Sequence, residues 1–226
     1  MNNRGQIGDG TLVSRSAPTA VSGALGFAEL APGAYTTCGR TLANVGYCWG
    51  DNGQGAIGDG TLVDPQPTPT AVAGGHVFIA LTSSGGSACG QTISNDVYCW
   101  GFNGNGELGD GTLEFRRSPT RVSGGLMFVE VAAEGAHSCG RVTSGAVYCW
   151  GLNNSGQLGD GTFVDRPTPT VPVAGGHTFA KLMSGGYYTC ARTTSNAVYC
   201  WGQNNFGQLG DGTTVNRNEP VAVPWP

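Results

Sequence analysis

A unit of about fifty residues repeats along the whole chain, and this repeat constrains the fold more than any other feature. The string Gly-Asp-Gly-Thr occurs five times, at steps of 50 or 51 residues. Its aspartates are Asp9, Asp59, Asp110, Asp160 and Asp211. Cys-Trp-Gly occurs four times at the same steps, with Trp49, Trp100, Trp150 and Trp201. Because one such unit cannot bury its apolar face alone, we expect neighbouring units to stack and share a core.

Each unit contains four short segments that are typical of β-strands. In one unit these segments are 128–131, 137–142, 147–150 and 169–173, separated by turns rich in Gly, Ser and Asn. The third segment, Val-Tyr-Cys-Trp, consists of strong strand formers. Large side chains alternate onto both of its faces, which indicates a sheet buried on both sides between neighbouring sheets. The repeated tryptophans are therefore predicted to pack between units.

Four short strands per unit without a helical period predict an all-β fold, a β-propeller with about four four-stranded blades. A β-solenoid is the competing interpretation. We expect a single repeat domain over residues 1–226, without linkers. Its units are 1–50, 51–101, 102–151, 152–202 and the half unit 203–226.

The chain has one fourth-strand segment more than it has sets of the first three strands. The five candidates are Pro18–Val21, Pro69–Val72, Pro119–Val122, Pro169–Val173 and Pro220–Val223. Either the first or the last of them therefore lacks a blade of its own. Met1 falls where Gln203 falls in the last unit, as in a cut at a repeat boundary. A partial ring would expose apolar blade faces, so we expect self-association, and two chains could supply eight blades.

Eight cysteines form four pairs, each ten residues apart on adjacent strands. The pairs are Cys38 with Cys48, Cys89 with Cys99, Cys139 with Cys149, and Cys190 with Cys200. A hairpin that turns between them places the partners opposite one another, so we predict four disulfides. Buried free thiols and metal binding are the alternatives, although zinc sites prefer cysteines two to four residues apart. Disulfides indicate an oxidising compartment, whereas residues 1–10 are polar and show no signal peptide.

The Gly-Asp-Gly-Thr loops are predicted to be structural. They lack the Lys and the following helix of a phosphate loop, and each offers one aspartate where a calcium loop needs several oxygen ligands. We expect the aspartate to cap the turn and to pair with an arginine six residues later. The predicted pairs are Asp9–Arg15, Asp110–Arg116, Asp160–Arg166 and Asp211–Arg217, and Pro65 interrupts the series. No cofactor and no metal are predicted.

Charge and composition exclude several functions. The net charge is −4, with a single lysine, so a nucleic-acid partner is not expected. No apolar run approaches the ~20 residues needed to span a membrane. The histidines His76, His137 and His177 have no Ser, Cys or Asp nearby in a nucleophile pattern, so we do not expect an enzyme.

The run Val-Tyr-Cys-Trp-Gly-x-Asn-x-x-Gly-Gln-Leu-Gly-Asp-Gly-Thr at 147–162 resembles the repeat of the regulator of chromosome condensation family. The resemblance recurs in every unit and implies a propeller. The cysteines make the chain similar to a secreted or surface-exposed bacterial branch of that family. A non-enzymatic role in protein–protein interaction or scaffolding is the main expectation. The alternatives are an inhibitor, a carbohydrate-binding module that uses one propeller face, and a fragment without independent function.

Binding residues are expected where the repeats differ from one another. The residue after Cys-Trp-Gly varies, and Phe102 is its bulkiest form. The most unusual loop contains Phe115, Arg116 and Arg117. Aromatic and arginine side chains are enriched at binding hot spots, so these four residues are the candidate binding residues.

Overall fold

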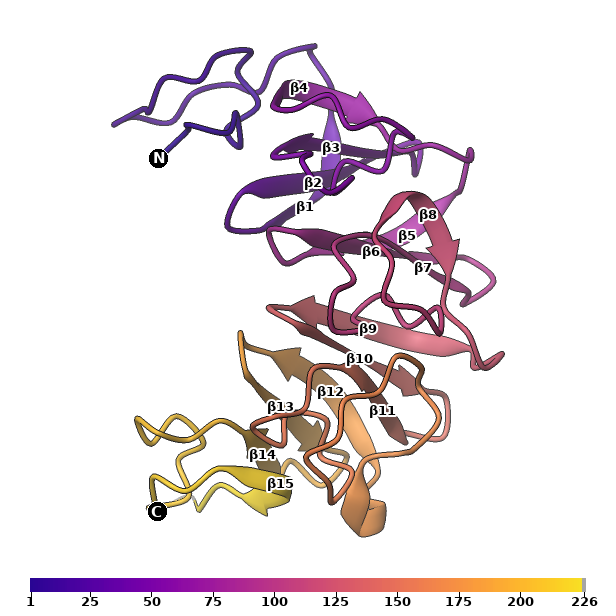
Figure 1. The fold of residues 1–226 in the computed structure, drawn as a ribbon, viewed down its shortest axis with the longest axis vertical. Helices are drawn as coiled ribbons and strands as arrows, with labels where there is room; N and C mark the ends of the chain where they lie inside the picture. The colour runs from indigo at the N-terminus through magenta and orange to yellow at the C-terminus, as the bar shows by residue number, and fades with distance from the viewer. Residues whose placement is uncertain (225–226) are drawn as a thin grey trace. The chain divides into compact units, whose positions relative to one another are not determined.

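A computed structural model describes residues 1–224, and their regular structure is almost entirely β-strand. Four antiparallel sheets follow one another along the chain, as the sequence predicts (Figure 1). The first sheet contains β1 (Phe27–Pro32), β2 (Thr36–Thr41), β3 (Gly46–Gly50) and β4 (Gln66–Ala71). The second contains β5 (Phe78–Ser83), β6 (Ser87–Thr92), β7 (Val97–Gly101) and β8 (Arg116–Arg121). Each of the two is a complete blade in which the strands pair in chain order.

The second half of the chain builds two further sheets. The third contains β9 (Phe128–Glu134), β10 (His137–Val142) and β11 (Val147–Gly151). The fourth contains β12 (Phe179–Ser184), β13 (Tyr188–Thr193), β14 (Val198–Gly202) and β15 (Arg217–Ala222). A short 3-10 turn, η1 (Ala174–Gly176), precedes β12.

The prediction of a fourth strand at Pro169–Val173 is wrong. This segment forms only single bridges, from Pro172 to Tyr148 and from nearby Arg166 to Gly151. The stretch 166–173 that contains this segment is one residue longer than its counterpart 66–72, and the additional Pro172 has no N–H to donate. The extra residue and the missing donor break the ladder, although the Val173 N–H still bonds to the Val147 carbonyl at 2.8 Å.

The surplus fourth-strand segment is the first one. Residues 18–21 form no strand, whereas β15 pairs with β14 and completes the last blade. Residues 1–26 therefore bring a repeat loop and its return segment without the three strands that precede them in other units.

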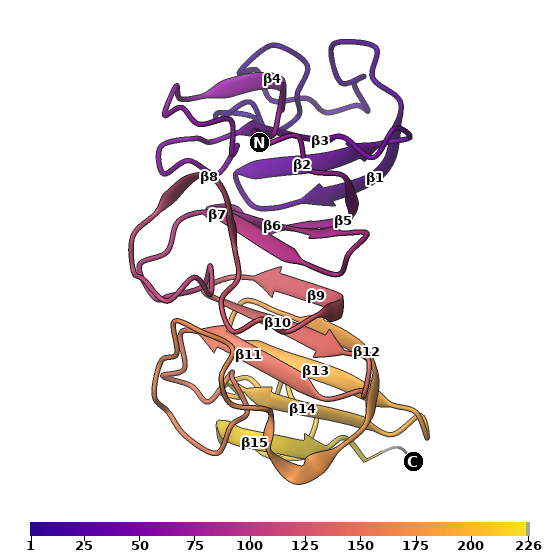
Figure 2. The same ribbon diagram turned by 90° about the vertical axis from the view of Figure 1, so that its right-hand side faces the viewer.

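The chain divides into two compact units. The first comprises residues 1–104 and 114–121, and the second comprises 105–113 and the residues from 122 onward. Within each unit two sheets stack face to face, as Figures 1 and 2 show for β1–β4 with β5–β8 and for β9–β11 with β12–β15. Apolar cores between the stacked blades hold each unit together.

The core of the first unit joins the Cys38–Cys48 disulfide, Ile57 and Val72 to Phe78 and Trp100 of the next blade. In the second unit the same positions meet: the Cys139–Cys149 disulfide and Leu158 pack with Phe179 and Trp201. All four repeat tryptophans are at most 1% exposed. The prediction that the tryptophans pack between neighbouring repeats is therefore confirmed for contacts that lie inside one compact unit.

The structure places all four predicted cysteine pairs at disulfide distance. The bonds join Cys38 to Cys48, Cys89 to Cys99, Cys139 to Cys149, and Cys190 to Cys200. In each hairpin the two cysteines stand directly opposite one another, as Cys89 on β6 and Cys99 on β7 do. Their Cα atoms lie 4.0–4.1 Å apart, and no free cysteine remains among residues 1–224.

These bonds lie mostly inside the blades. Seven of the eight cysteine side chains are buried, including Cys99 at 0% exposed, and only Cys190 is half-buried. The alternative of free thiols is not what the structure contains. The disulfides instead form part of the packed interior of each blade.

Candidate functional site: the repeat loops

The loops between the third and fourth segments of each repeat carry most of the polar side chains that recur, and we call them the repeat loops. They span residues 1–13, 51–63, 102–114, 152–164 and 203–215. In each of them the aspartate accepts two hydrogen bonds from the threonine two residues later. In Asp211, for example, Oδ1 accepts from the Thr213 N–H at 2.9 Å and from its Oγ1 at 2.7 Å. The predicted capping role of the aspartate is therefore confirmed.

A buried asparagine closes each loop from inside, a role that was not predicted from the sequence. Asn153 is fully buried, and its side-chain NH2 donates to the carbonyls of Thr162 and Val164, both at 3.1 Å. Its Oδ1 accepts the Leu158 N–H at 2.9 Å. Asn2, Asn52 and Asn204 are equally buried and make matching bonds. The signal was present in the sequence, because this asparagine recurs two residues after every Cys-Trp-Gly.

Three of the four predicted ion pairs are confirmed. Arg15 lies 2.7 Å from the Asp9 carboxylate, Arg166 lies 2.5 Å from Asp160, and Arg217 lies 2.7 Å from Asp211. The fourth pair, Asp110–Arg116, stays a prediction.

These contacts lower the pKa values of Asp9, Asp160 and Asp211. Burial alone would raise the pKa of Asp211, but hydrogen bonds from Thr213, Arg217 and Asn204 outweigh burial and lower that pKa to about 2. The pKa of Asp160 is lowered by the same balance, with bonds from Thr162 and Arg166 opposing burial. These three aspartates are thus fixed charged groups that hold their loops closed.

Three of the four candidate binding residues meet in one place. Phe115, Arg116 and Arg117 line an open hollow of about 500 Å³ together with Gly60 and Ser118. The Phe115 side chain is 44% exposed. In the repeats around it, a polar side chain in this position accepts a backbone N–H, as Asp64 does from Asn52 at 2.8 Å. Phe115 cannot accept such a bond, so the third repeat presents an aromatic side chain where the others close their loop.

Phe102 does not line this hollow. It is half-buried, and its ring covers Gly104 so closely that a Cβ there would lie 2.5 Å from the Phe102 Cζ. Its N–H bonds to the Gly86 carbonyl at 2.8 Å. These contacts give Phe102 a local packing role, and its part in binding stays a prediction.

Two buried titratable groups of the second unit lie in the core. His137 is 1% exposed, and burial lowers its pKa to about 4. Its Nε2 lies 2.8 Å from the Thr189 hydroxyl. Glu107 is 2% exposed, and burial raises its pKa. Its carboxylate accepts the Asn105 N–H at 2.8 Å, and its backbone carbonyl accepts the Trp150 Nε1–H at 2.9 Å. Both side chains are held by structural contacts.

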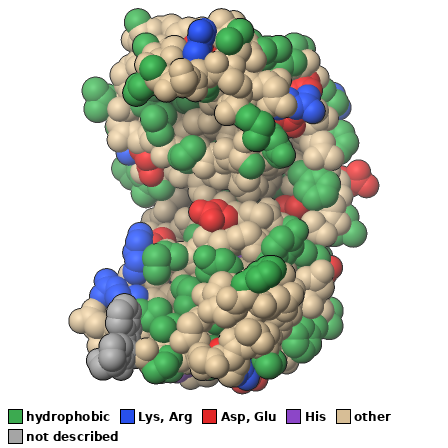
Figure 3. All heavy atoms as spheres, turned by 90° about the vertical axis from the view of Figure 1, so that its left-hand side faces the viewer, with side chains coloured by type: hydrophobic (Ala, Val, Ile, Leu, Met, Phe, Trp, Pro, Cys, Tyr) green, Lys and Arg blue, Asp and Glu red, His purple; other side chains and the backbone are tan. Residues whose placement is uncertain are grey.

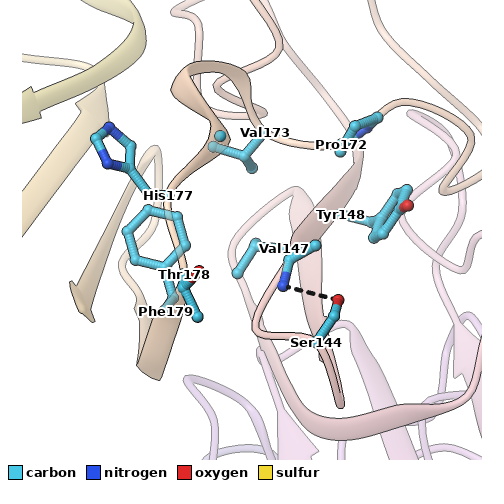
Figure 4. A pocket seen from close by; sticks show the side chains of 10 residues that line it. Ser144, Val147, Tyr148, Pro172, Val173, His177, Thr178 and Phe179 are labelled. Atoms are coloured by element: carbon cyan, nitrogen blue, oxygen red, sulfur yellow. Dashed lines mark hydrogen bonds between the residues drawn. The ribbon is translucent and has the colours of Figure 1, made fainter. Parts of the chain in front are cut away.

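A second cavity lies in the second unit, between the β10–β11 turn and the start of β12 (Figure 4). It has a volume of about 340 Å³ and is lined by Val147, Tyr148, Pro172, His177 and Phe179 among others. The His177 ring stacks on Tyr199 with ring centres 4.1 Å apart. His76 stacks on Tyr98 in the same way, so both histidines pack their blade. The lining contains no carboxylate and no thiol that could act with His177.

Two further properties concern residues 1–224. Within that range, no three His, Cys, Asp or Glu side chains come together as metal ligands would. The same residues include no helix of the length and apolarity that a bilayer crossing requires.

Known proteins with similar sequences and folds place this arrangement in a family. A model of the regulator of chromosome condensation (RCC1) repeat matches residues 94–140, 144–192 and 195–226, and a second model of this repeat matches 128–157 and 179–208. The ultraviolet-B receptor UVR8 of Arabidopsis thaliana is 39% identical over 51 residues, which are 22% of this chain and 12% of that protein.

Solved structures agree with the fold. Human WBSCR16 superposes with a TM-score of 0.87 at 19% identity, over 100% of this chain and 61% of that one. Prp20p from Saccharomyces cerevisiae superposes with a TM-score of 0.79 at 19% identity, over 92% of this chain and 52% of that one. The chain thus spans about half to three-fifths of these proteins. With repeat models covering more than half of its length, the chain belongs to the family of regulator of chromosome condensation (RCC1) repeat proteins.

Proposed function

We propose that this chain is a non-enzymatic, extracytoplasmic scaffold that binds a protein partner through its repeat loops and also associates with itself. The observation that carries the proposal is the hollow formed by Phe115, Arg116 and Arg117. Propellers of this family bind proteins: the structure of Prp20p was described together with its binding to Gsp1p and histones. Fold likeness at 19% identity does not transfer those partners to this chain.

The tips of the repeat loops support a protein partner. Beyond each Gly-Asp-Gly-Thr, apolar side chains are exposed at the same register of each repeat. They are Leu12, Val13, Leu62, Val63, Leu113, Phe163, Val164 and Val215, all at least 41% exposed. The space-filling view shows apolar side chains on the surface of both units (Figure 3). Exposed apolar groups at regular positions are typical of interaction surfaces.

The third repeat adds charge and an aromatic ring to this pattern. Phe115 offers an apolar contact, and Arg117 beside it is exposed. A matching partner presents an acidic side chain next to an apolar one, since guanidinium groups pair with carboxylates and stack on apolar surfaces.

The extracytoplasmic part of the proposal is supported by the cysteines. Four disulfides are compatible with an extracellular location, because such bonds persist in oxidising compartments. Their burial in the blade cores makes them part of the fold. A bacterial source stays a prediction that rests on the resemblance.

A library of displayed random peptides tests the loop-binding proposal. The immobilised chain should enrich peptides that carry Asp or Glu beside an aromatic or aliphatic residue. Synthetic versions should lose at least tenfold in affinity for the variant Phe115→Ser/Arg117→Ser. The matched control is Ile93→Ser, which removes a 77% exposed apolar side chain from the β6–β7 turn. Peptides that bind the double variant and the wild type equally would refute this site.

A further inference from the structure

One of the residues that line the hollow at Phe115 has a cationic side chain that the rest of the fold does not use. The sequence has eleven lysine and arginine residues, and all of them lie within residues 1–224. Eight pair with a carboxylate: Arg4, Arg15, Arg40, Arg121, Arg141, Arg166, Arg217 and Lys181. Arg192 donates to the Asn196 side chain, and Arg116 also has a partner. In residues 1–224, the Arg117 side chain is therefore the only one of the eleven with neither an ion pair nor a hydrogen bond.

The fold needs only the backbone of Arg117. Its counterparts in the other repeats are Ser16, Pro67, Pro167 and Asn218. The Arg117 carbonyl accepts the Gly60 N–H at 2.8 Å, just as the Pro67 carbonyl accepts the Gly10 N–H at 3.0 Å. Since proline and asparagine serve at the same position, packing does not require a guanidinium group there.

A register shift in β8 turns two consecutive side chains toward solvent. Residues 117–119 stand opposite the single Trp100, because the pairing of β7 with β8 shifts there. Side chains alternate between the two faces of a regular strand, whereas a bulge changes their direction. Arg117 and Ser118 are accordingly both exposed. Among residues 1–224 the Ser118 hydroxyl has no hydrogen-bond partner, so both side chains are available to a ligand.

The hollow has room for more than an anionic group. Its volume is about 500 Å³, and cavities of this size hold whole small molecules. Phe115 lines it with a ring that is 44% exposed. A guanidinium fork takes two oxygens of an anion, and the Ser118 hydroxyl can donate to a third. A carboxylate has only two oxygens, whereas a sulfate or phosphate ester has three terminal oxygens, so this donor set suits an ester attached to an aromatic or apolar body.

The charge of the chain favours one localised anion over an extended one. Nucleic acids and other polyanions gain affinity from several cations, each of which neutralises one charge. This chain has a net charge of −4, and in the part that the structure describes Arg117 is the one lysine or arginine side chain without a partner. A single anion on a peptide therefore matches the surface better than a polyanion does.

We propose that the hollow at Phe115 and Arg117 binds the O-sulfate or O-phosphate ester of a tyrosine side chain in the partner protein. This inference rests on the proposed peptide-binding role of the same hollow and names the group that is bound. The ester oxygens pair with the Arg117 guanidinium and the Ser118 hydroxyl, and the phenyl ring packs against Phe115. One tyrosine side chain then supplies both the acidic and the apolar group that the hollow matches.

Binding of small probes to the full chain tests this proposal. N-acetyl-tyrosine amide is compared with its O-sulfate and its O-phosphate, with N-acetyl-glutamate amide and with inorganic sulfate, at constant ionic strength. NMR titrations follow the amide signals of Gly60 and Ser118. We expect the esters to bind at least tenfold more tightly than unmodified tyrosine, the glutamate probe or inorganic sulfate. The ester with the lower Kd shows which of the two modifications the hollow prefers.

Two variants and a matched control assign the binding to its residues. Arg117→Asn removes the charge and introduces the residue type of its counterpart Asn218. It should weaken ester binding at least tenfold and leave the affinity for unmodified tyrosine unchanged. Phe115→Ser should weaken binding of the esters and of unmodified tyrosine alike. The control is Arg121→Asn on the same strand, whose side chain is 54% exposed but pairs with Asp96, and it should bind the esters as wild type does.

The outcomes separate this inference from the proposed function. Equal ester affinity in wild type and Arg117→Asn overturns the anion site, and so does an equal loss in Arg117→Asn and Arg121→Asn. Equal affinity for the esters and the glutamate probe overturns the preference for an ester and leaves a site for acidic peptides. If no ester binds at millimolar concentration, the inference fails, whereas displayed peptides that lose affinity for Phe115→Ser/Arg117→Ser still support the proposed function.

Discussion

The repeat loops 152–164 and 203–215 have nearly the same sequence and the same internal hydrogen bonds, yet their surroundings differ. Asn153 and Asn204 are both fully buried, and both aspartates hold an arginine. The first loop is covered by Trp201 and β15, whereas among residues 1–224 a Cβ at Gly210 in the second loop would meet only Val223. The comparison shows that local sequence determines the conformation of a repeat loop, whereas the neighbouring blade determines how much its packing contributes to stability.

Disulfide removal should give the largest difference between a covered and an open blade. Both bonds span ten residues, so on the chain-entropy model each contributes about 3 kcal/mol. Cys139→Ala/Cys149→Ala also leaves a cavity in a closed core, so we expect a loss of about 3–5 kcal/mol in the free energy of unfolding. Cys190→Ala/Cys200→Ala should cost less, and urea unfolding measures both.

The two disulfides should also differ in how quickly a reductant opens them. Cys190 is half-buried, whereas Cys139 is fully buried, so a small reductant should open the Cys190–Cys200 bond first. Alkylation and mass spectrometry after brief treatment with reductant give the order. Reduction of Cys139–Cys149 before Cys190–Cys200 would contradict the comparison.

Replacing the glycine before the loop aspartate, Gly159 or Gly210, should give the next largest difference in stability. Gly159→Asn forces the Trp201 indole to move, because a Cβ there would lie 2.6 Å from its Nε1. Such overpacking costs about 1–3 kcal/mol. Gly210→Asn meets only Val223 and should change stability by less than about 0.5 kcal/mol at protein concentrations too low for association. Thermal unfolding of the two variants measures the difference, and equal losses would show that the fifth loop is covered.

Acidification should destabilise both loops. The folded pKa of Asp211 is about 2, below its ordinary value of 3.8. Because ionised Asp211 is favoured in the folded chain, its contribution to stability is complete above pH ~4 and is lost as the pH falls toward 2. Asp160, whose pKa is also lowered, adds to this loss. Carbon NMR of the carboxyl groups gives the two pKa values, and a value for Asp211 near 3.8 would contradict the closed loop.

Much of this architecture could be predicted because it depends on residues that lie close together in the sequence of each repeat. The hairpins, the cysteine pairs and the packed tryptophans each depend on residues a fixed distance apart within one unit. The fourth strand at Pro169–Val173 failed because one inserted residue and Pro172 disturb a ladder that depends on register. Regular patterns hide such single-residue departures.

The candidate site was less predictable for a different reason. Phe115, Arg116 and Arg117 were chosen because they depart from the repeat; they line one open hollow, and their part in binding stays a prediction. The open loop at 203–213 conforms to the repeat, so nothing in its own sequence distinguishes it from a covered one. Whether Gly210 faces an indole depends on a blade that lies further along the chain or in another chain, and a sequence pattern contains no such information.

Removing the loop arginines should have the smallest effect on the free energy of unfolding, and a specific effect on amide exchange in the loops. Arg166 and Arg217 are 26% and 36% exposed, and exposed ion pairs contribute about 0–1 kcal/mol. Arg166→Ala and Arg217→Ala should therefore change global stability little. In the covered loop, Trp201 still holds residues 152–164 in place. In the open loop, Arg217 is one of few restraints on Asp211, so its loss should accelerate amide exchange at Leu209 and Thr213 more than Arg166→Ala accelerates it at Leu158 and Thr162. Equal exchange in the two variants would mean that the internal hydrogen bonds of Asn204 suffice, and that the neighbouring blade adds nothing to the order of a repeat loop.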